Sequence, residues 1–373
     1  MRKQERNEAA RVLIFLLGSL GDTVVALPAL HLIARRYPEA ERRVLANRVT
    51  HPKAASMASL LDGTGLVQDY FWFPPPSKRA SRLREMLRVA RTIRAWKPDV
   101  LIYLHEQRGR IIALRDFTIF RLLGIRRLIG IPLNRDLQRN FFHQDRGRYE
   151  HRCEYLSRSL VSLGDPMLVH RSSWALNLSS TERGRAASEL NALQVCPGVL
   201  AMSVGTKIDV NDWGDGNWRA LLLDLGRRLR GWGLVALGAP AEHSRSSELL
   251  SSWRGPSLNL CGKLTVRESA AVLERARLFI GHDSGPMHLA AAVGTPCAAV
   301  FSARHLPGLW FPYGDHHKVF YNKTDCAGCG LDVCVKFGKK CIGGISVGEV
   351  VEAVTSMLSA EAKESAARQP AHA

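Results

Sequence analysis

Short hydrophobic runs of strand length alternate with amphipathic helical segments along most of the chain. Continuous apolar strands separated by helices are typical of a parallel sheet that is covered on both faces. The pattern therefore predicts an α/β protein with two Rossmann-like domains facing each other across a cleft, into which the carboxyl ends of the strands open. The predicted strands lie near 12–17, 43–47, 67–71, 100–104, 127–131, 199–204, 233–237, 258–260, 278–281 and 297–301, and the helices near 23–37, 81–96, 109–123, 218–230, 241–253, 266–276 and 287–293.

The periodicity is interrupted once, around 164–180, where a Gly-Asp-Pro turn and a polar Ser/Thr cluster replace it. A chain of 373 residues is also longer than one hydrophobic core usually supports. We therefore expect one domain over 1–170 and a second over 171–358. Residues 359–373 are rich in Ala, Glu, Lys and Gln, and we expect them to be disordered.

The charge is concentrated in the first half. The net charge is +18, of which residues 1–170 carry +14. Such a surface attracts phosphate-bearing partners, namely nucleic acid, an anionic membrane or a phosphorylated lipid or sugar, although a solvated basic surface explains it as well. The helix expected at 81–96 has an apolar stripe among five arginines, which suits either packing on its own sheet or contact with anionic lipid.

The N-terminus does not read as a signal peptide, because the apolar run after Val12 contains Gly18 and ends at Gly21 without a cleavage site. No segment has the roughly 20 uninterrupted apolar residues of a membrane-spanning helix. We expect a cytoplasmic protein, at most peripheral to the inner face of the membrane.

The first strand leads into a glycine-containing turn, Leu17-Gly18-Ser19-Leu20-Gly21-Asp22, that opens a helix. The turn lacks the third glycine of the dinucleotide-binding fingerprint. Asp22 is either an N-cap or a general base at the mouth of the cleft. The positive end of a helix weakens a carboxylate as a base, while desolvation strengthens it.

A second motif joins the strand near 278–281 to a helix of small residues. Backbone amides at the start of such a helix form a seat for a diphosphate, which Ser284 and Gly285 would line. Asp283 could accept hydrogen bonds from sugar hydroxyls, and His288 could donate to a phosphate. The turn after the strand at 199–204 offers further contacts from three consecutive residues, Gly205, Thr206 and Lys207.

Four cysteines form a compact cluster in a loop rich in Gly and Lys. Four thiolates at this spacing could hold a structural zinc ion with no open coordination position. The spacing is not that of two CxxC units, and Cys261 is expected to pack in the core instead. The cluster consists of Cys326, Cys329, Cys334 and Cys341.

Taken together, the two motifs resemble glycosyltransferase family 9, the bacterial heptosyltransferases and their relatives in lipopolysaccharide assembly. The resemblance extends over roughly 11–354. It rests on Ser-Leu-Gly-Asp at 19–22 and Asp-Ser-Gly-Pro-Met-His-Leu-Ala-Ala-Ala at 283–292, supported by Leu-Pro-Ala-Leu at 27–30, Lys-Pro-Asp-Val-Leu-Ile at 97–102 and Trp-Phe-Pro-Tyr-Gly at 310–314.

The resemblance implies a GT-B fold and inverting transfer from a nucleotide-sugar, often ADP-heptose, with no cofactor needed for catalysis. The acceptor would be a phosphorylated, lipid-linked core oligosaccharide bound by the first domain, with Asp22 as the base and Ser19 and Gly21 in contact. The second domain would bind the donor through Asp283, Ser284, Gly285 and His288, with Gly205, Thr206 and Lys207 at its phosphates.

The chain departs from the family pattern at Asn211-Asp212, where many relatives carry Lys or Arg before the tryptophan of the phosphate loop. The cationic role would then pass to Lys207, or the donor would differ. Two other functions stay open at this stage. One is a sugar-nucleotide epimerase or hydrolase of the same fold. The other is a basic nucleic-acid-binding protein, which we do not expect because no basic-aromatic recognition module is visible.

Overall fold

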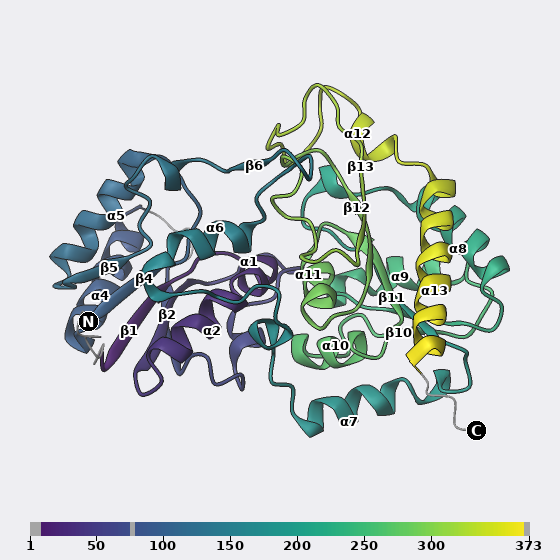
Figure 1. The fold of residues 1–373 in the computed structure, drawn as a ribbon, viewed down its shortest axis with the longest axis horizontal. Coiled ribbons are helices and arrows are strands. Elements are labelled where there is room, and N and C mark those ends of the chain that lie inside the picture. Colours follow the sequence, from purple (N-terminus) through teal and green to yellow (C-terminus); the bar gives the residue numbers. More distant parts are fainter. Residues whose placement is uncertain (1–8, 75–78, 369–373) are drawn as a thin grey trace. The chain divides into compact units, whose positions relative to one another are not determined.

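The computed structural model of the protein describes residues 9–74 and 79–368 (Figure 1). It divides into two compact units, Met1–Asn177 and Leu178–Ala373, which are called unit 1 and unit 2 below. Each unit is a parallel sheet covered by helices, so the fold is that of two Rossmann-like α/β domains.

The division falls seven residues after the boundary expected at 170. The intervening segment is held by unit 1. The ring nitrogen Nε2 of His31 lies 2.9 Å from the carbonyl oxygen of Ala175, and Asn177 Nδ2 donates to the carbonyl oxygen of Thr64 at 2.8 Å. These are contacts between residues more than 100 positions apart, which composition does not reveal.

The sheet of unit 1 has five parallel strands in the order β3-β2-β1-β4-β5. Its central strand is fully buried at Val12, Leu13 and Ile14, as a strand with helices on both faces must be. Phe15 at its end pairs with Leu45 on one side and Tyr103 on the other. The strands are β1 (Arg11–Phe15), β2 (Glu41–Asn47), β3 (Asp69–Phe73), β4 (Val100–Tyr103) and β5 (Arg127–Ile129).

Helices pack on both faces of this sheet. The single helix predicted over 23–37 is two helices that meet at Ala26, because Pro28 begins a new helix in its first turn, where a missing N–H is tolerated. Ile93 and Phe120, from two different helices, share one cluster of buried side chains with Leu13. The helices are α1 (Leu20–Val25), α2 (Leu27–Arg36), α3 (Ala58–Leu61), α4 (Arg79–Trp96), α5 (Arg110–Leu122) and α6 (Arg152–Ser159); a short hairpin of β6 (Phe142–His143) and β7 (Arg148–Tyr149) precedes α6.

The sheet of unit 2 has six parallel strands in the order β10-β9-β8-β11-β12-β13. Its core includes Leu200 of the sheet, the fully buried Trp218 and Val351 of the C-terminal helix. The strands are β8 (Val199–Ser203), β9 (Gly233–Ala236), β10 (Ser257–Asn259), β11 (Leu278–His282), β12 (Cys297–Phe301) and β13 (Lys318–Tyr321). The helices are α7 (Ser180–Glu189), α8 (Asp215–Arg228), α9 (His243–Leu250), α10 (Val266–Leu273), α11 (Gly285–Ala292), α12 (Lys340–Gly343) and α13 (Val347–Arg368).

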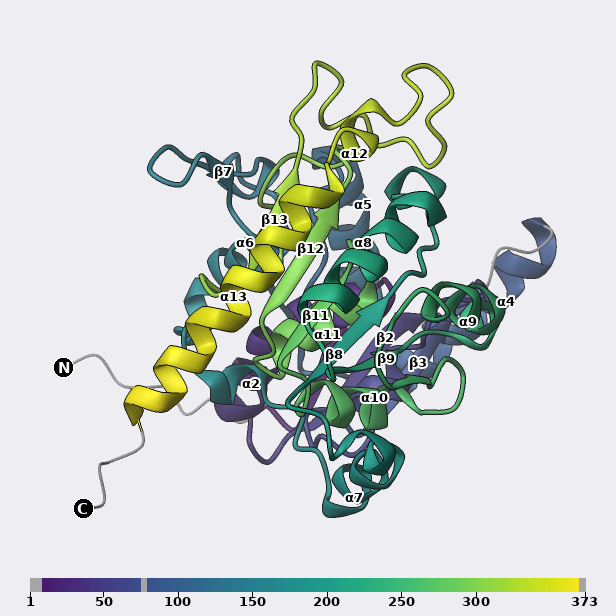
Figure 2. The ribbon, with the colours of Figure 1, turned by 90° about the vertical axis from the view of Figure 1, so that its right-hand side faces the viewer.

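The C-terminal segment is the main correction to the predicted elements. We expected disorder from residue 359, but α13 continues to Arg368, because Ala, Glu and Lys are good helix formers. Figure 2 shows this helix crossing in front of β12 and β13. Residues 369–373 lie outside the described part of the chain. Among the described residues, no helix is both long and apolar enough to cross a membrane.

Candidate active site

Each sheet has one point at which the order of its strands reverses, and ligands of such sheets bind there, outside the carboxyl ends of the strands. In unit 1 the reversal lies between β1 and β4, and in unit 2 between β8 and β11. The turn that carries Asp22 follows β1. The turns at 204–207 and 283–285 follow β8 and β11, which are paired at Ser203 and Gly281. Within each unit, the predicted site residues therefore lie at the expected edge of the sheet.

Ser19 is the N-cap residue of the helix, and the Asp22 carboxylate completes the capping box, so the capping role expected for Asp22 is present in this form. Asp22 is the third residue of α1, and its Oδ2 accepts a hydrogen bond from the Ser19 amide at 2.7 Å. Gly18 lies directly against the carboxylate: a Cβ atom there would come within 2.2 Å of Asp22 Cγ. The turn itself is attached to β2 by the Gly18 amide, which donates to Asn47 Oδ1 at 2.6 Å. The carboxylate is thus held in one orientation.

The loop after β4 contributes polar residues to the same edge of unit 1, which the sequence analysis did not single out. The ring of His105 stacks on Phe15, with 6.0 Å between centroids. Burial, aided by the charge of Arg108, lowers the pKa of His105 to about 4, so the ring is neutral at pH 7. Arg108 also lies 3.5 Å from the buried carboxylate of Asp116. This edge of unit 1 thus has both a neutral imidazole and a guanidinium close to the strand that precedes Asp22.

In unit 2, Gly205 lies against a buried carboxylate that sequence reasoning missed. A Cβ atom on Gly205 would come within 1.7 Å of Glu242 Oε1, and one on Gly238 within 2.3 Å of Glu242 Oε2. Glu242 is 7% exposed and accepts a hydrogen bond from the Ala239 amide at 2.8 Å. The absence of side chains on both glycines is what allows this carboxylate to sit at the ends of β8 and β9.

The N-terminus of α11 presents Ser284 as its N-cap residue, but the Ser284 side chain makes no capping bond. Within the described residues, its Oγ is buried and has no hydrogen-bond partner. A buried hydroxyl of this kind costs free energy unless a ligand or water bonds it. Gly285 follows and has no side chain, so its amide can be approached closely, whereas Pro286 has no N–H to donate.

His288 lies close to the Asp283 carboxylate. It is 5% exposed, its Nε2 is 3.9 Å from Asp283 Oδ1, and its ring meets Trp310 edge to face at 5.9 Å. Burial lowers the pKa of His288 to about 4, so the ring is neutral near pH 7. Any contribution to donor binding is therefore through a hydrogen bond or through the placement of Asp283, and not through positive charge.

His282 has a structural role that its position alone did not suggest. It is fully buried, its Nε2 accepts a hydrogen bond from the Trp213 amide at 3.0 Å, and burial lowers its pKa to about 4. The ring thereby fastens the loop over 209–214 to β11. Arg245 holds the same loop from the other side through Asp212 at 2.8 Å and Asp215 at 2.7 Å.

These contacts explain the departure from the family pattern at Asn211-Asp212. Asn211 is buried and bonded to Ser302, while the Asp212 carboxylate is paired with Arg245. Although burial acts against it, the bond from Arg245 keeps the pKa of Asp212 below its usual value. Arg245, the cation beside this loop, is thus paired with carboxylates of the protein itself. Lys207 lies on the turn after β8 and is exposed to solvent.

The four cysteines of the predicted zinc site do not form a metal centre in the described structure. No group of three or more His, Cys, Asp or Glu side chains among the described residues is arranged to hold a metal ion. Cys341 is buried, and Cys334 Sγ accepts from the Lys339 amide at 3.3 Å. Backbone amides of Lys339 and Phe337 lower the pKa of Cys334. The geometry gives the zinc prediction no support.

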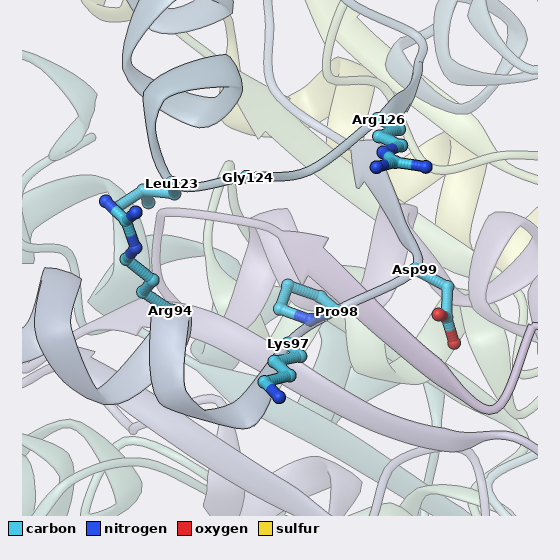
Figure 3. A pocket seen from close by; sticks show the side chains of 7 residues that line it. All are labelled: Arg94, Lys97, Pro98, Asp99, Leu123, Gly124 and Arg126. Carbon is cyan, nitrogen blue, oxygen red and sulfur yellow. The ribbon is translucent and has the colours of Figure 1, made fainter.

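One pocket, with a volume of about 450 Å³, lies away from these edges (Figure 3). Its lining comes from the segments that precede β4 and β5, so it is at the amino ends of the strands. Figure 3 shows Arg94, Lys97 and Arg126 around it. The carboxylate of Asp99 beside them accepts hydrogen bonds from the amides of Ala10 and Arg11. This pocket is separate from both candidate edges.

Comparison with known proteins agrees with the motifs. Residues 158–336 match the model of glycosyltransferase family 9 (heptosyltransferase). The chain is 24% identical to lipopolysaccharide heptosyltransferase 3 of Escherichia coli over 313 residues, which cover 81% of this chain and 86% of that protein.

Two solved structures have a similar fold. One is the glycosyl transferase family 9 protein of Veillonella parvula, with a TM-score of 0.70, 17% identity and coverage of 94% and 97% of the two chains. The other is E. coli heptosyltransferase WaaC with ADP-2-deoxy-2-fluoro heptose, with a TM-score of 0.57, 18% identity and coverage of 93% and 99%. The fold is therefore of the GT-B type, and the predicted glycosyltransferase activity is confirmed. The resemblance of the chain to glycosyltransferase family 9 is thereby confirmed.

Proposed function

We propose that the protein transfers a heptose from ADP-heptose to a lipopolysaccharide-core or related glycan acceptor, with inversion at the anomeric carbon and without a catalytic metal. The names of the similar proteins support the class of reaction: one is a lipopolysaccharide heptosyltransferase, and another was solved with an ADP-heptose analogue. The observation that carries the donor site is the buried Ser284 hydroxyl at the N-terminus of α11, which has no hydrogen-bond partner in the described part of the chain.

The donor diphosphate would bind at that helix start. The amides of the first turn and the Ser284 hydroxyl would donate to its oxygens, as anions at helix N-termini require. Lys207, exposed on the neighbouring turn, would add a positive charge. Asp283, backed by His288 at 3.9 Å, would accept hydrogen bonds from the sugar hydroxyls.

Glu242 extends this donor site. A buried carboxylate at the ends of β8 and β9 suits the hydroxyls of a ribose, which carboxylates at this edge of Rossmann-like sheets commonly bind. Gly205 lies against the same carboxylate. We therefore assign Gly205 the role of keeping this side of the donor site open, with Thr206 and Lys207 nearer the phosphates.

Asp22 would act as the general base. The Ser19 amide fixes Oδ2, so the carboxylate is oriented before the acceptor arrives. Ser19 and Gly21 belong to the same turn and would contact the acceptor. The acceptor hydroxyl loses its proton to Asp22 and attacks the anomeric carbon, while the bond to the diphosphate breaks. The released ADP is stabilised by the amides of α11 and by Lys207.

The proposal is tested by a panel of ADP-, UDP- and GDP-sugars in a thermal-shift assay, followed by transfer assays with the donor that binds. At equal concentration, a donor that binds more tightly raises the apparent melting temperature more, because the stabilisation grows with the logarithm of concentration divided by Kd. We expect ADP-heptose to give the largest shift and to be consumed only when an acceptor is present. Consumption of the donor without any acceptor would instead support an epimerase or hydrolase.

A further inference from the structure

Unit 1 exposes a set of large apolar side chains on two helices that cover the same face of its sheet. On α4 and α5 together, seven such residues are exposed to solvent, in addition to the apolar side chains with which the two helices pack on the sheet. A helix that packs on a sheet usually has one apolar stripe, which it buries. Single exposed apolar residues are common on protein surfaces, but seven large ones on two neighbouring helices are uncommon. We call this surface the α4–α5 face. Its exposed apolar residues are Leu83 (58%), Met86 (37%), Leu87 (48%), Ile111 (87%), Leu114 (58%), Ile119 (44%) and Leu122 (71%).

On α5 the buried residues lie on the side of the helix opposite the exposed ones: Ala113 and Phe120 are at most 5% exposed. On α4 the C-terminal half packs on the sheet through Ile93, which is 1% exposed, whereas the large apolar residues of the N-terminal half are exposed. Ile93, Ala113 and Phe120 share one cluster with the sheet. Packing on the sheet therefore does not account for Leu83 and Leu87, which lie one helical turn apart in the N-terminal half of α4.

The segment that contains both helices is strongly basic. Residues 79–127 contain thirteen Lys or Arg and four Asp or Glu, a net of nine positive charges and half of the chain's +18. Three of the four acids are engaged within the protein: Asp116 with Arg115, Asp99 with backbone amides, and Glu106 with Arg152. Arg84, Arg88 and Arg91 are exposed beside the outer leucines of α4.

We propose that the α4–α5 face docks on the surface of an anionic phospholipid bilayer. Exposed Leu and Ile side chains between arginines match the boundary of headgroups and acyl chains, where the apolar groups insert and the guanidinium groups meet lipid phosphates. A second copy of the chain would bring two faces of this charge together, which repels. A nucleic acid would use the arginines and leave the leucines exposed to water.

The test compares binding of the purified full-length protein to vesicles of phosphatidylcholine alone and with 30 mol% phosphatidylglycerol by co-sedimentation. We expect binding to the mixed vesicles and at least about tenfold weaker binding to phosphatidylcholine alone. The triple change R84Q/R88Q/R91Q should weaken binding about 100-fold, from about a factor of five for each arginine. The control R227Q/R230Q/R254Q removes three exposed arginines of unit 2 and should change it less than threefold.

A second variant pair tests insertion and separates a membrane from a nucleic acid. I111S/L114S/L122S should weaken vesicle binding by about tenfold or more and abolish the part that survives 0.5 M NaCl, because inserted apolar groups are not screened by salt. The control V161S/V169S/V195S removes three apolar side chains that are 79%, 86% and 91% exposed elsewhere, and should leave binding unchanged. Unaltered far-UV circular dichroism and melting temperature establish that each variant folds.

The proposal is overturned if the protein does not bind mixed vesicles, or if both face variants bind them as the controls do. It is also overturned if the arginine variant loses affinity for RNA or DNA while vesicle binding is unchanged, since the basic surface then serves a nucleic acid. Loss of binding in both face variants, with both controls intact, supports it.

Discussion

Replacing Ser284 by Ala separates a donor contact from an ordinary helix cap. In the structure the Ser284 Oγ is buried without a hydrogen-bond partner among the described residues, so its removal breaks no bond in the free protein. Leaving a buried polar group unsatisfied costs about 1–3 kcal/mol, so removing the hydroxyl should raise the free energy of unfolding by up to that amount. A hydrogen bond to a charged phosphate contributes about 1.5–3 kcal/mol, so the donor Kd should rise about 10- to 150-fold.

The matched control is Ser173, whose side chain is also buried but donates to the carbonyl oxygen of Pro166 at 2.8 Å. Its replacement by Ala should lower the free energy of unfolding by about 1 kcal/mol and leave donor binding unchanged. Urea unfolding gives the stabilities, and calorimetry with ADP-heptose gives the Kd. If Ser284→Ala instead lowers stability by about 1 kcal/mol and leaves the Kd unchanged, the serine is a helix cap in solution and the reasoning is refuted.

Three further predictions follow from the two sheet edges. Gly18→Ala should reduce kcat by about 100-fold or more, because the new Cβ displaces the Asp22 carboxylate. The control is Gly124→Ala, where φ is also positive but no atom lies within 4 Å of the new Cβ. It should lower the free energy of unfolding by only about 1–2 kcal/mol and leave kcat unchanged. Gly205→Ala should raise the KM for the donor at least about tenfold by pushing Glu242 aside, and an unchanged KM would remove both from the donor site. The free energy of unfolding should fall as the pH drops from 6.5 towards 4, because His282 and His288 have pKa values of about 4 in the folded protein and about 6.5 in the unfolded chain. At pH 5 each histidine would lower the free energy of unfolding by up to about 2 kcal/mol. Urea unfolding at pH 7.5 and 5.0 can measure this difference.

The order of strands and helices could be predicted because it depends on local periodicity. The buried run from Val12 to Leu16 reads as a parallel strand from the residues alone. The same reasoning could place Asp22, Gly205 and Ser284 at strand ends, and hence at the edges where ligands bind. The resemblance to glycosyltransferase family 9, carried by the motifs at 19–22 and 283–292, was confirmed by the comparisons.

Contacts between distant residues could not be predicted. Glu242 lies 37 positions after Gly205, and only the folded sheet brings its carboxylate over that glycine. Arg245 reaches Asp212 for the same reason, so the ion pair that holds this carboxylate could not be predicted from the sequence. The role of His282 depends on a bond to the amide of Trp213, 69 residues away. The neutral state of His288 could not be predicted either, because it results from the burial of the ring, which lowers its pKa to about 4.

The central claim is tested most directly by measuring transfer and donor binding together in wild type and Asp22→Asn. The assay follows ADP release and product mass with ADP-heptose in the presence and absence of a heptose-deficient core acceptor, while calorimetry gives donor affinity. We predict acceptor-dependent ADP release, a product one heptose heavier, and in the variant a loss of turnover of about 100-fold or more with donor Kd nearly unchanged. Unchanged turnover in Asp22→Asn, or ADP release that needs no acceptor, would contradict the account.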